Sequence, residues 1–108
     1  MGFLEKQGPV ELEESIPLLS NLDVDEIFLD EGHDVHWQIF TEITAKKEVV
    51  EVLALEDSST VKWNTYARIK QGGKINYEID ITSDGTTMKI NITNNELETL
   101  NVKLIRFS

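Results

Sequence analysis

The two histidines of this 108-residue chain both lie in the stretch DEGHDVHW, Asp30 to Trp37, among three acidic side chains. Imidazole nitrogens and carboxylate oxygens are common ligands of divalent metals, so His33, Asp34 and His36 are candidate ligands. On a regular strand, however, residues three apart point to opposite faces, and only an irregular turn would bring both rings onto one ion. We therefore expect no metal site here, and no stretch of the sequence indicates another cofactor.

A second oxygen-rich stretch, NLDVDEIFLDEG, begins like a calcium-binding loop, with Asn21, Asp23 and Asp25 at alternate positions. Glu26 then occupies the sixth position, where the sharp turn of such a loop needs glycine. Gly32 occupies the twelfth position, where a glutamate would bind the ion with both carboxylate oxygens. The spacing thus does not predict a calcium-binding loop.

Catalytic motifs are missing as well. The chain has no cysteine, and it contains neither the nucleophile pattern GxSxG nor the phosphate-binding pattern GxxxxGK[ST]. Its twenty acidic residues allow many carboxylate pairs, but only a fold brings two particular carboxylates together. We predict that the protein is not an enzyme.

The net charge of −10 comes from one part of the sequence. Ten acids and no Lys or Arg lie between Gln7 and Ala45, whereas the rest of the chain carries ten acids and ten bases. Such a negative field repels nucleic acids and anionic lipids, so we expect neither as a direct ligand. It favours a protein partner with a basic surface, and a second copy of the chain is a further candidate. Without a signal sequence or a long apolar run, we expect the protein in the cytoplasm, or in a virion if it is viral.

The elements that must position any site are β-strands. Apolar residues alternate with polar ones from Val35 onward, most clearly in KINYEIDIT, and Ser83-Asp84-Gly85 supplies a hairpin turn. The pattern predicts strands near 35–44, 48–56, 60–70, 74–82, 86–93 and 97–107, with Gly72-Gly73 as another hairpin turn. We predict one all-β domain over residues 1–108, an antiparallel sandwich or flattened barrel of six to seven strands with meander-type connections.

The acidic segment 1–34 is expected to pack on this sheet or to extend from it. Pro17 favours a short helix that begins near it, because proline suits a first helical turn. The alternative is a short strand through Ile27 and Leu29 that pairs with residues 35–44 across Gly32.

The predicted core follows from the alternation. It contains Trp37, Ile39, Val49, Leu53, Val61, Trp63, Ile69, Ile75, Tyr77, Ile79, Ile81, Met88, Ile90, Ile92, Val102 and Leu104. Thr65 and Ala67 are expected to point inward with Ile69. Two strands do not fit a simple two-sided pattern: EVVEVLALE and LNVKLIRF carry apolar residues on both faces. These strands are either covered on both sides or in contact with a partner.

Two kinds of side chain are candidates for contacting a partner protein. Aromatic residues on predicted polar strand faces are common in binding surfaces, and acids suit a basic partner. The candidates are Phe40, Tyr66, Asp23, Asp25, Glu26, Asp30 and Glu31. These features favour a non-enzymatic protein-interaction or assembly module, such as a small structural component of a phage or another multi-protein particle. The alternatives are an acidic inhibitor or immunity protein that covers a basic surface of a nuclease or toxin, and a ligand-binding β-barrel or small hydrolase with a deep pocket.

Overall fold

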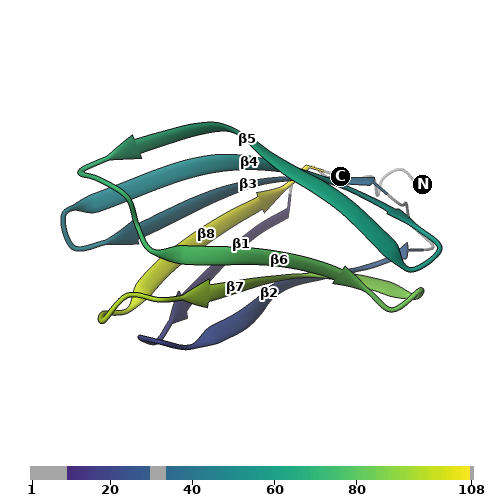
Figure 1. Ribbon diagram of the computed structural model, residues 1–108, viewed down its shortest axis with the longest axis horizontal. Coiled ribbons are helices and arrows are strands. Elements are labelled where there is room, and N and C mark those ends of the chain that lie inside the picture. The colour runs from purple at the N-terminus through teal and green to yellow at the C-terminus, as the bar shows by residue number, and fades with distance from the viewer. Residues whose placement is uncertain (1–9, 30–33, 108) are drawn as a thin grey trace, which may run out of the picture.

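The computed structural model describes residues 10–29 and 34–107, which form eight strands and no α-helix. The strands are β1 (Val10–Ile16), β2 (Asn21–Phe28), β3 (Asp34–Ile43), β4 (Lys46–Asp57), β5 (Thr60–Gln71), β6 (Tyr77–Ser83), β7 (Thr87–Asn94) and β8 (Leu100–Arg106). In Figure 1, β3, β4 and β5 lie together in the upper part of the view, and β6, β7 and β2 lie below them. Nothing in the described part of the chain forms a helix that could span a membrane.

The strands form two antiparallel sheets that pack against each other. A five-stranded sheet has the order β1-β8-β3-β4-β5, and a three-stranded sheet has the order β2-β7-β6. The predicted antiparallel β-sandwich is thereby confirmed, with eight strands in place of six or seven. Only some connections follow a meander, because β8 lies between β1 and β3, and β2 lies beside β7.

The additional strands come from the N-terminal acidic segment, which gives one strand to each sheet. The helix expected near Pro17 is absent, because residues 17–20 form a turn in which the Ser20 amide donates to the Pro17 carbonyl. The alternative pairing across Gly32 is also wrong, since β2 pairs with β7 and not with β3. Asn94 explains the position of the turn: its buried side-chain amide donates to the carbonyls of Ile16, Pro17 and Glu98.

The turns follow local chemistry with one exception. The hairpin at Asp84-Gly85 is confirmed, and the Asp84 carboxylate accepts hydrogen bonds from the amides of Thr86 and Thr87 at 2.8 Å. Gly72-Gly73 is not a hairpin turn, because it leads from β5 in one sheet to β6 in the other. Gly72 has φ of +86°, and a side chain there would collide with the Ala45 carbonyl oxygen.

The core lies between the sheets. Its largest fully buried side chains come from both layers, among them Trp37 and Ile39 of β3 and Met88, Ile90 and Ile92 of β7. The predicted core residues on β3, β7 and β8 are all confirmed as buried, and so are Ile75 and Ile81. Val61, Trp63, Tyr77 and Ile79 are partly buried and pack against this core.

On β4 the predicted direction of the side chains was wrong. Val50, Val52 and Ala54 are the buried residues, whereas Val49 is half-buried and Leu53 is 52% exposed. Both alternating sets of this strand are apolar, so the sequence alone could not choose between them. The neighbouring strand β3 decides, because Trp37 of its buried set pairs with Val52.

On β5 the error has a different cause, a β-bulge at Ala67. The register between β4 and β5 shifts between Val49 and Glu51, and Ala67 has φ of +52°. The extra residue reverses the facing of the side chains that follow it. Ile69, predicted in the core, is therefore 67% exposed, and Arg68 points inward to pair with Glu48. Thr65 precedes the bulge and lies beside the inward-facing Val52, as predicted, but it is exposed, and so is Ala67 at the bulge.

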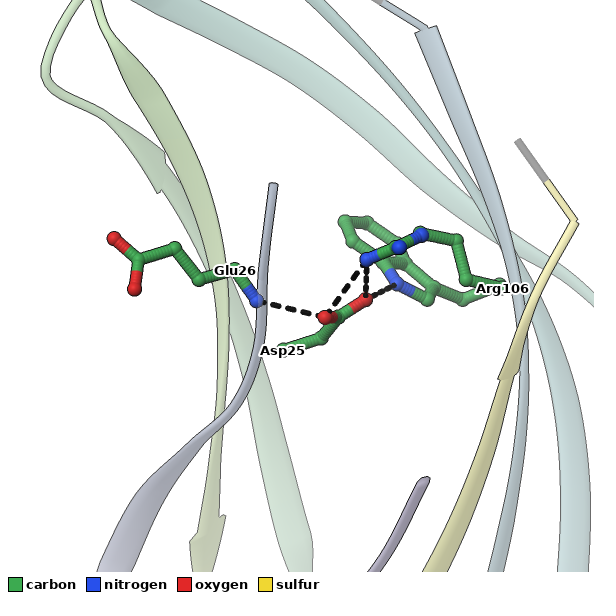
Figure 2. A network of polar contacts seen from close by, with 4 residues as sticks. Asp25, Glu26 and Arg106 are labelled. Carbon is green, nitrogen blue, oxygen red and sulfur yellow. Dashed lines mark hydrogen bonds and ion pairs between the residues drawn. The ribbon is translucent and has the colours of Figure 1, made fainter. Parts of the chain in front are cut away.

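Several polar contacts join the two sheets in the described part of the chain, and two of these joins include an ion pair. Asp25 of β2 accepts hydrogen bonds from the Trp37 indole at 2.9 Å and from Arg106 of β8 at 2.8 and 2.9 Å. Figure 2 shows the Asp25 carboxylate directed at the Arg106 guanidinium from the opposite sheet. Farther along, the buried carboxylate of Glu48 pairs with Arg68 and accepts from the Tyr77 hydroxyl of β6 at 2.8 Å.

Candidate interaction surface

The solvent-facing side of the five-stranded sheet, called the outer face below, is rich in apolar side chains. The register places neighbouring residues of adjacent strands in rows across this face. One row runs Glu13, Lys103, Phe40, Val49, Ile69, and the next outward-facing row runs Glu11, Ile105, Gln38, Glu51, Tyr66. His36 and Leu53 continue the face beyond the second row, where Phe107 lies beside His36.

Many of these apolar side chains are open to solvent. Phe40, Leu53, Leu55, Tyr66, Ile69 and Phe107 are between 37% and 67% exposed. Single exposed apolar residues are ordinary on protein surfaces, but contiguous groups mark binding sites. Here the six residues lie on three adjacent strands and the end of a fourth, so they form a group and not scattered exceptions.

A polar network lies at the centre of the outer face. The Glu51 carboxylate pairs with the His36 ring and accepts a hydrogen bond from the Gln38 amide at 3.0 Å. The hydrogen bond from His36 lowers the pKa of the Glu51 carboxyl below its usual value, and the bond from Gln38 acts in the same direction. The His36 ring stacks on Tyr66 and contacts Phe107, with ring centroids 6.2 and 5.0 Å away. The network therefore fixes the positions of two exposed aromatic side chains.

A trough of about 720 Å³ crosses the outer face beside this network. Its apolar lining includes Phe40, Val49 and Ile69, while Lys47 and Lys103 add positive charge. Acidic side chains, including Glu13 and Glu42, lie along the same trough. Such a lining of apolar and oppositely charged groups suits a protein segment laid across the strands. It does not bring nucleophile, base and oxyanion donors together around one point.

The candidate interaction residues of the sequence fall in different places. Phe40 and Tyr66 are both exposed on the outer face. Asp23 and Glu26 are exposed on the opposite side of the molecule, on β2. Asp25 is buried and bonded to Arg106, so its carboxylate is not available to a partner. Asp30 and Glu31 lie outside the described residues.

The candidate metal ligands are not grouped by the fold. His33 lies outside the described residues, Asp34 is exposed, and His36 is engaged with Glu51. Within residues 10–29 and 34–107, no cluster of three or more His, Asp or Glu side chains is arranged to hold a metal ion.

Sequence reasoning missed several residues of the outer face. The alternation predicts Leu53 and Ile69 in the core, and it does not distinguish Leu55 or Phe107. The useful signal was the two-sided apolar pattern of EVVEVLALE and LNVKLIRF, which indicates that both faces of β4 and β8 are apolar. Comparisons with known proteins add no assignment: no protein family model matches the sequence, and no curated protein matches it.

Proposed function

We propose that this chain is a non-enzymatic protein-interaction or assembly module that binds a protein partner through the outer face of its five-stranded sheet. The observation that carries the proposal is the exposed apolar group made by Phe40, Leu53, Leu55, Ile69 and the aromatic pair Tyr66 and Phe107. Desolvating such a group on binding is favourable, and aromatic side chains held in place by neighbours lose little entropy when they bind.

A small structural component of a multi-protein particle, such as a phage virion, is the role that we favour. In such a particle one face of each subunit is permanently covered, which accounts for an apolar sheet face that a free protein would keep polar. The net charge of −10 favours a partner with a basic surface at the rim of this contact. The cytoplasm and the assembled particle are the corresponding locations.

The rival hypothesis of an acidic inhibitor or immunity protein makes use of the charge but leaves the outer face unexplained. Contacts between such a protein and a basic active site would depend mainly on acids. A ligand-binding barrel is less well supported, since the trough is an open feature of the sheet surface and not an enclosed interior pocket.

The test is co-purification with the products of the neighbouring genes, using the triple variant Leu53→Asn/Leu55→Asn/Ile69→Asn. All three side chains are more than half exposed, so the free energy of unfolding of the variant should lie within about 2 kcal/mol of the wild-type value. A partner that binds the wild type should be lost from the variant and retained by the control Phe28→Asn, which removes an exposed apolar residue of the other sheet. A chain that binds none of these products, or a partner that the triple variant still binds equally well, would refute the proposal.

A further inference from the structure

The two edge strands of the five-stranded sheet carry opposite charges. β1 contains Glu11, Glu13 and Glu14 and no basic residue. β5, at the other end of the sheet, contains Lys62, Arg68 and Lys70 and no acidic residue. Two of these charges are paired within the molecule: Arg68 with the buried Glu48, and Glu11 with Lys103 of β8 at 2.7 Å. The remaining charged residues of the two edges form no ion pair among the described residues.

Both edges are also open along the backbone. In the described part of the chain, β1 forms a ladder with β8 alone and β5 with β4 alone. One side of each strand therefore presents amide and carbonyl groups that can pair with another strand. β5 is exposed along most of its 12 residues.

Charge on an edge strand commonly prevents unwanted pairing, and charges of one sign on both edges would serve that purpose. Opposite signs have a more specific effect. Pairing of β5 with β5 of another copy would place basic residues together, and pairing of β1 with β1 would place acids together. Only the pairing of β1 with β5 brings unlike charges into contact, so the signs select one of three possible junctions.

We propose that the occupant of each edge is a second copy of this chain, with β1 of one copy pairing with β5 of the next. The two surfaces differ, so the contact is head-to-tail and generates a closed ring or an open filament. β1 and β5 run in the same direction, because four antiparallel steps separate them. Copies that repeat with the same face outward thus meet in a parallel junction, and the outer face continues from copy to copy.

This inference goes beyond the proposed function, because it identifies a partner and a second surface, and it rests on the open strand edges and their charges and not on the exposed apolar group of the outer face. The test is sedimentation velocity of the full chain over a range of concentrations. The variants are the β1 reversal Glu13→Lys/Glu14→Lys and the β5 reversal Lys62→Glu/Lys70→Glu. All four side chains are exposed, and none forms an ion pair in the described part of the molecule. The control Glu26→Lys/Asp80→Lys reverses two exposed acids of the three-stranded sheet and changes the net charge as much as the β1 reversal does.

The wild type and the control should associate beyond the dimer as concentration rises. Each reversal alone should weaken association by about tenfold, because it turns the attraction between the two edges into repulsion. An equal mixture of the two reversals should associate again, since one protein then has two basic edges and the other has two acidic edges.

A wild type that stays monomeric, reversals that associate like the wild type, or a mixture that fails to recover association would each overturn the inference. Circular dichroism and the unfolding midpoint show whether each variant is folded. If a double reversal does not fold, the single reversal Glu13→Lys or Lys62→Glu is used in its place. The outer-face variant Leu53→Asn/Leu55→Asn changes only β4 and leaves both edge strands unaltered, so its self-association reports on the edges independently of partner binding.

Discussion

The two solvent-facing sheet surfaces of this molecule differ in composition although both are antiparallel and both are open. The outer surface of the three-stranded sheet is polar, and there the side-chain amide of Asn91 donates to Asn21 at 3.1 Å and to Asp23 at 2.9 Å. Its other outward side chains are Glu26, Phe28, Glu78, Asp80, Thr82, Lys89 and Thr93. Phe28 is its single exposed large apolar member among the described residues, whereas the outer face of the five-stranded sheet has six exposed ones.

This difference indicates which of the two surfaces is suited to bind a partner. A sheet with one buried face and one solvated face is stable when its residues alternate between apolar and polar, and β6 does so. β4 departs from this rule because its outward set includes Val49, Leu53 and Leu55. Because the other sheet of the same chain keeps its solvent-facing side polar, a general excess of apolar residues does not explain the apolar outer face. A function of that face does.

Both surfaces depend on the packing of the two sheets against each other. The largest expected loss of stability comes from removing the Asp25 carboxylate, which bonds to both Trp37 and Arg106 of the other sheet. Replacing Asp25 by Ala leaves the Arg106 guanidinium and the Trp37 indole without their buried acceptor. We expect the free energy of unfolding to fall by about 3–5 kcal/mol, as for other buried ion pairs that lose one partner. Urea unfolding followed by tryptophan fluorescence measures this change.

The matched control is Asp23→Ala, which removes an exposed carboxylate two residues away on the same strand. It should cost less than about 1 kcal/mol. Equal losses for Asp23→Ala and Asp25→Ala would show that the Asp25 pair does not join the sheets.

The second join, at Tyr77, should respond to alkaline pH. Burial and the hydrogen bond to Glu48 raise the pKa of Tyr77 from 10.0 to about 12. The stabilisation is complete below pH 10, and it is lost as pH rises toward 12, because the unfolded chain loses the phenol proton first. The loss should be about 2–3 kcal/mol, since one unit of pKa difference corresponds to about 1.4 kcal/mol.

In the variant Tyr77→Phe this part of the alkaline loss should disappear, although the variant is less stable at neutral pH. Unfolding curves between pH 9 and 12 give the comparison, with Tyr66→Phe of the outer face as the control that keeps the loss. If Tyr77→Phe and the wild type lose stability in parallel over this range, the assignment to Tyr77 is incorrect.

A glycine substitution tests the backbone strain at the bulge that places Ile69 on the outer face. Ala67 has φ of +52°, a left-handed conformation that is unfavourable for residues with a Cβ. Ala67→Gly should therefore stabilise the protein by about 0.5–1 kcal/mol, although glycine usually weakens strands. Thermal unfolding provides the measurement. The control is Ala54→Gly on β4, where the residue is buried and φ is not positive, and it should lower the stability of the protein. A change in stability of the same sign for both variants would rule out strain at Ala67.

The smallest expected effect concerns the polar network at the centre of the outer face. In His36→Gln the main cause of the lowered pKa of Glu51 is removed, so this pKa should rise toward 4.5. The sign follows from the depressed pKa of the folded state: Glu51 stabilises the protein above pH 4.5, and this stabilisation is lost on acidification. NMR titration of the Glu51 carboxyl in both proteins measures the shift. An unchanged Glu51 pKa in His36→Gln would contradict the assignment to His36.

The sequence by itself determined the β-class, the antiparallel pairing and the Asp84-Gly85 hairpin, because alternation and turn chemistry are local properties. It also indicated that β4 and β8 are apolar on both faces. It did not determine which face of β4 is buried, because both alternating sets are apolar and neighbouring strands decide between them. The reversal after Ala67 and the burial of Asp25 depend on partners that are distant in sequence, namely β4 for the bulge and Trp37 and Arg106 for the carboxylate. Only the tertiary structure brings these residues together, and with them the apolar outer face and the two oppositely charged edges.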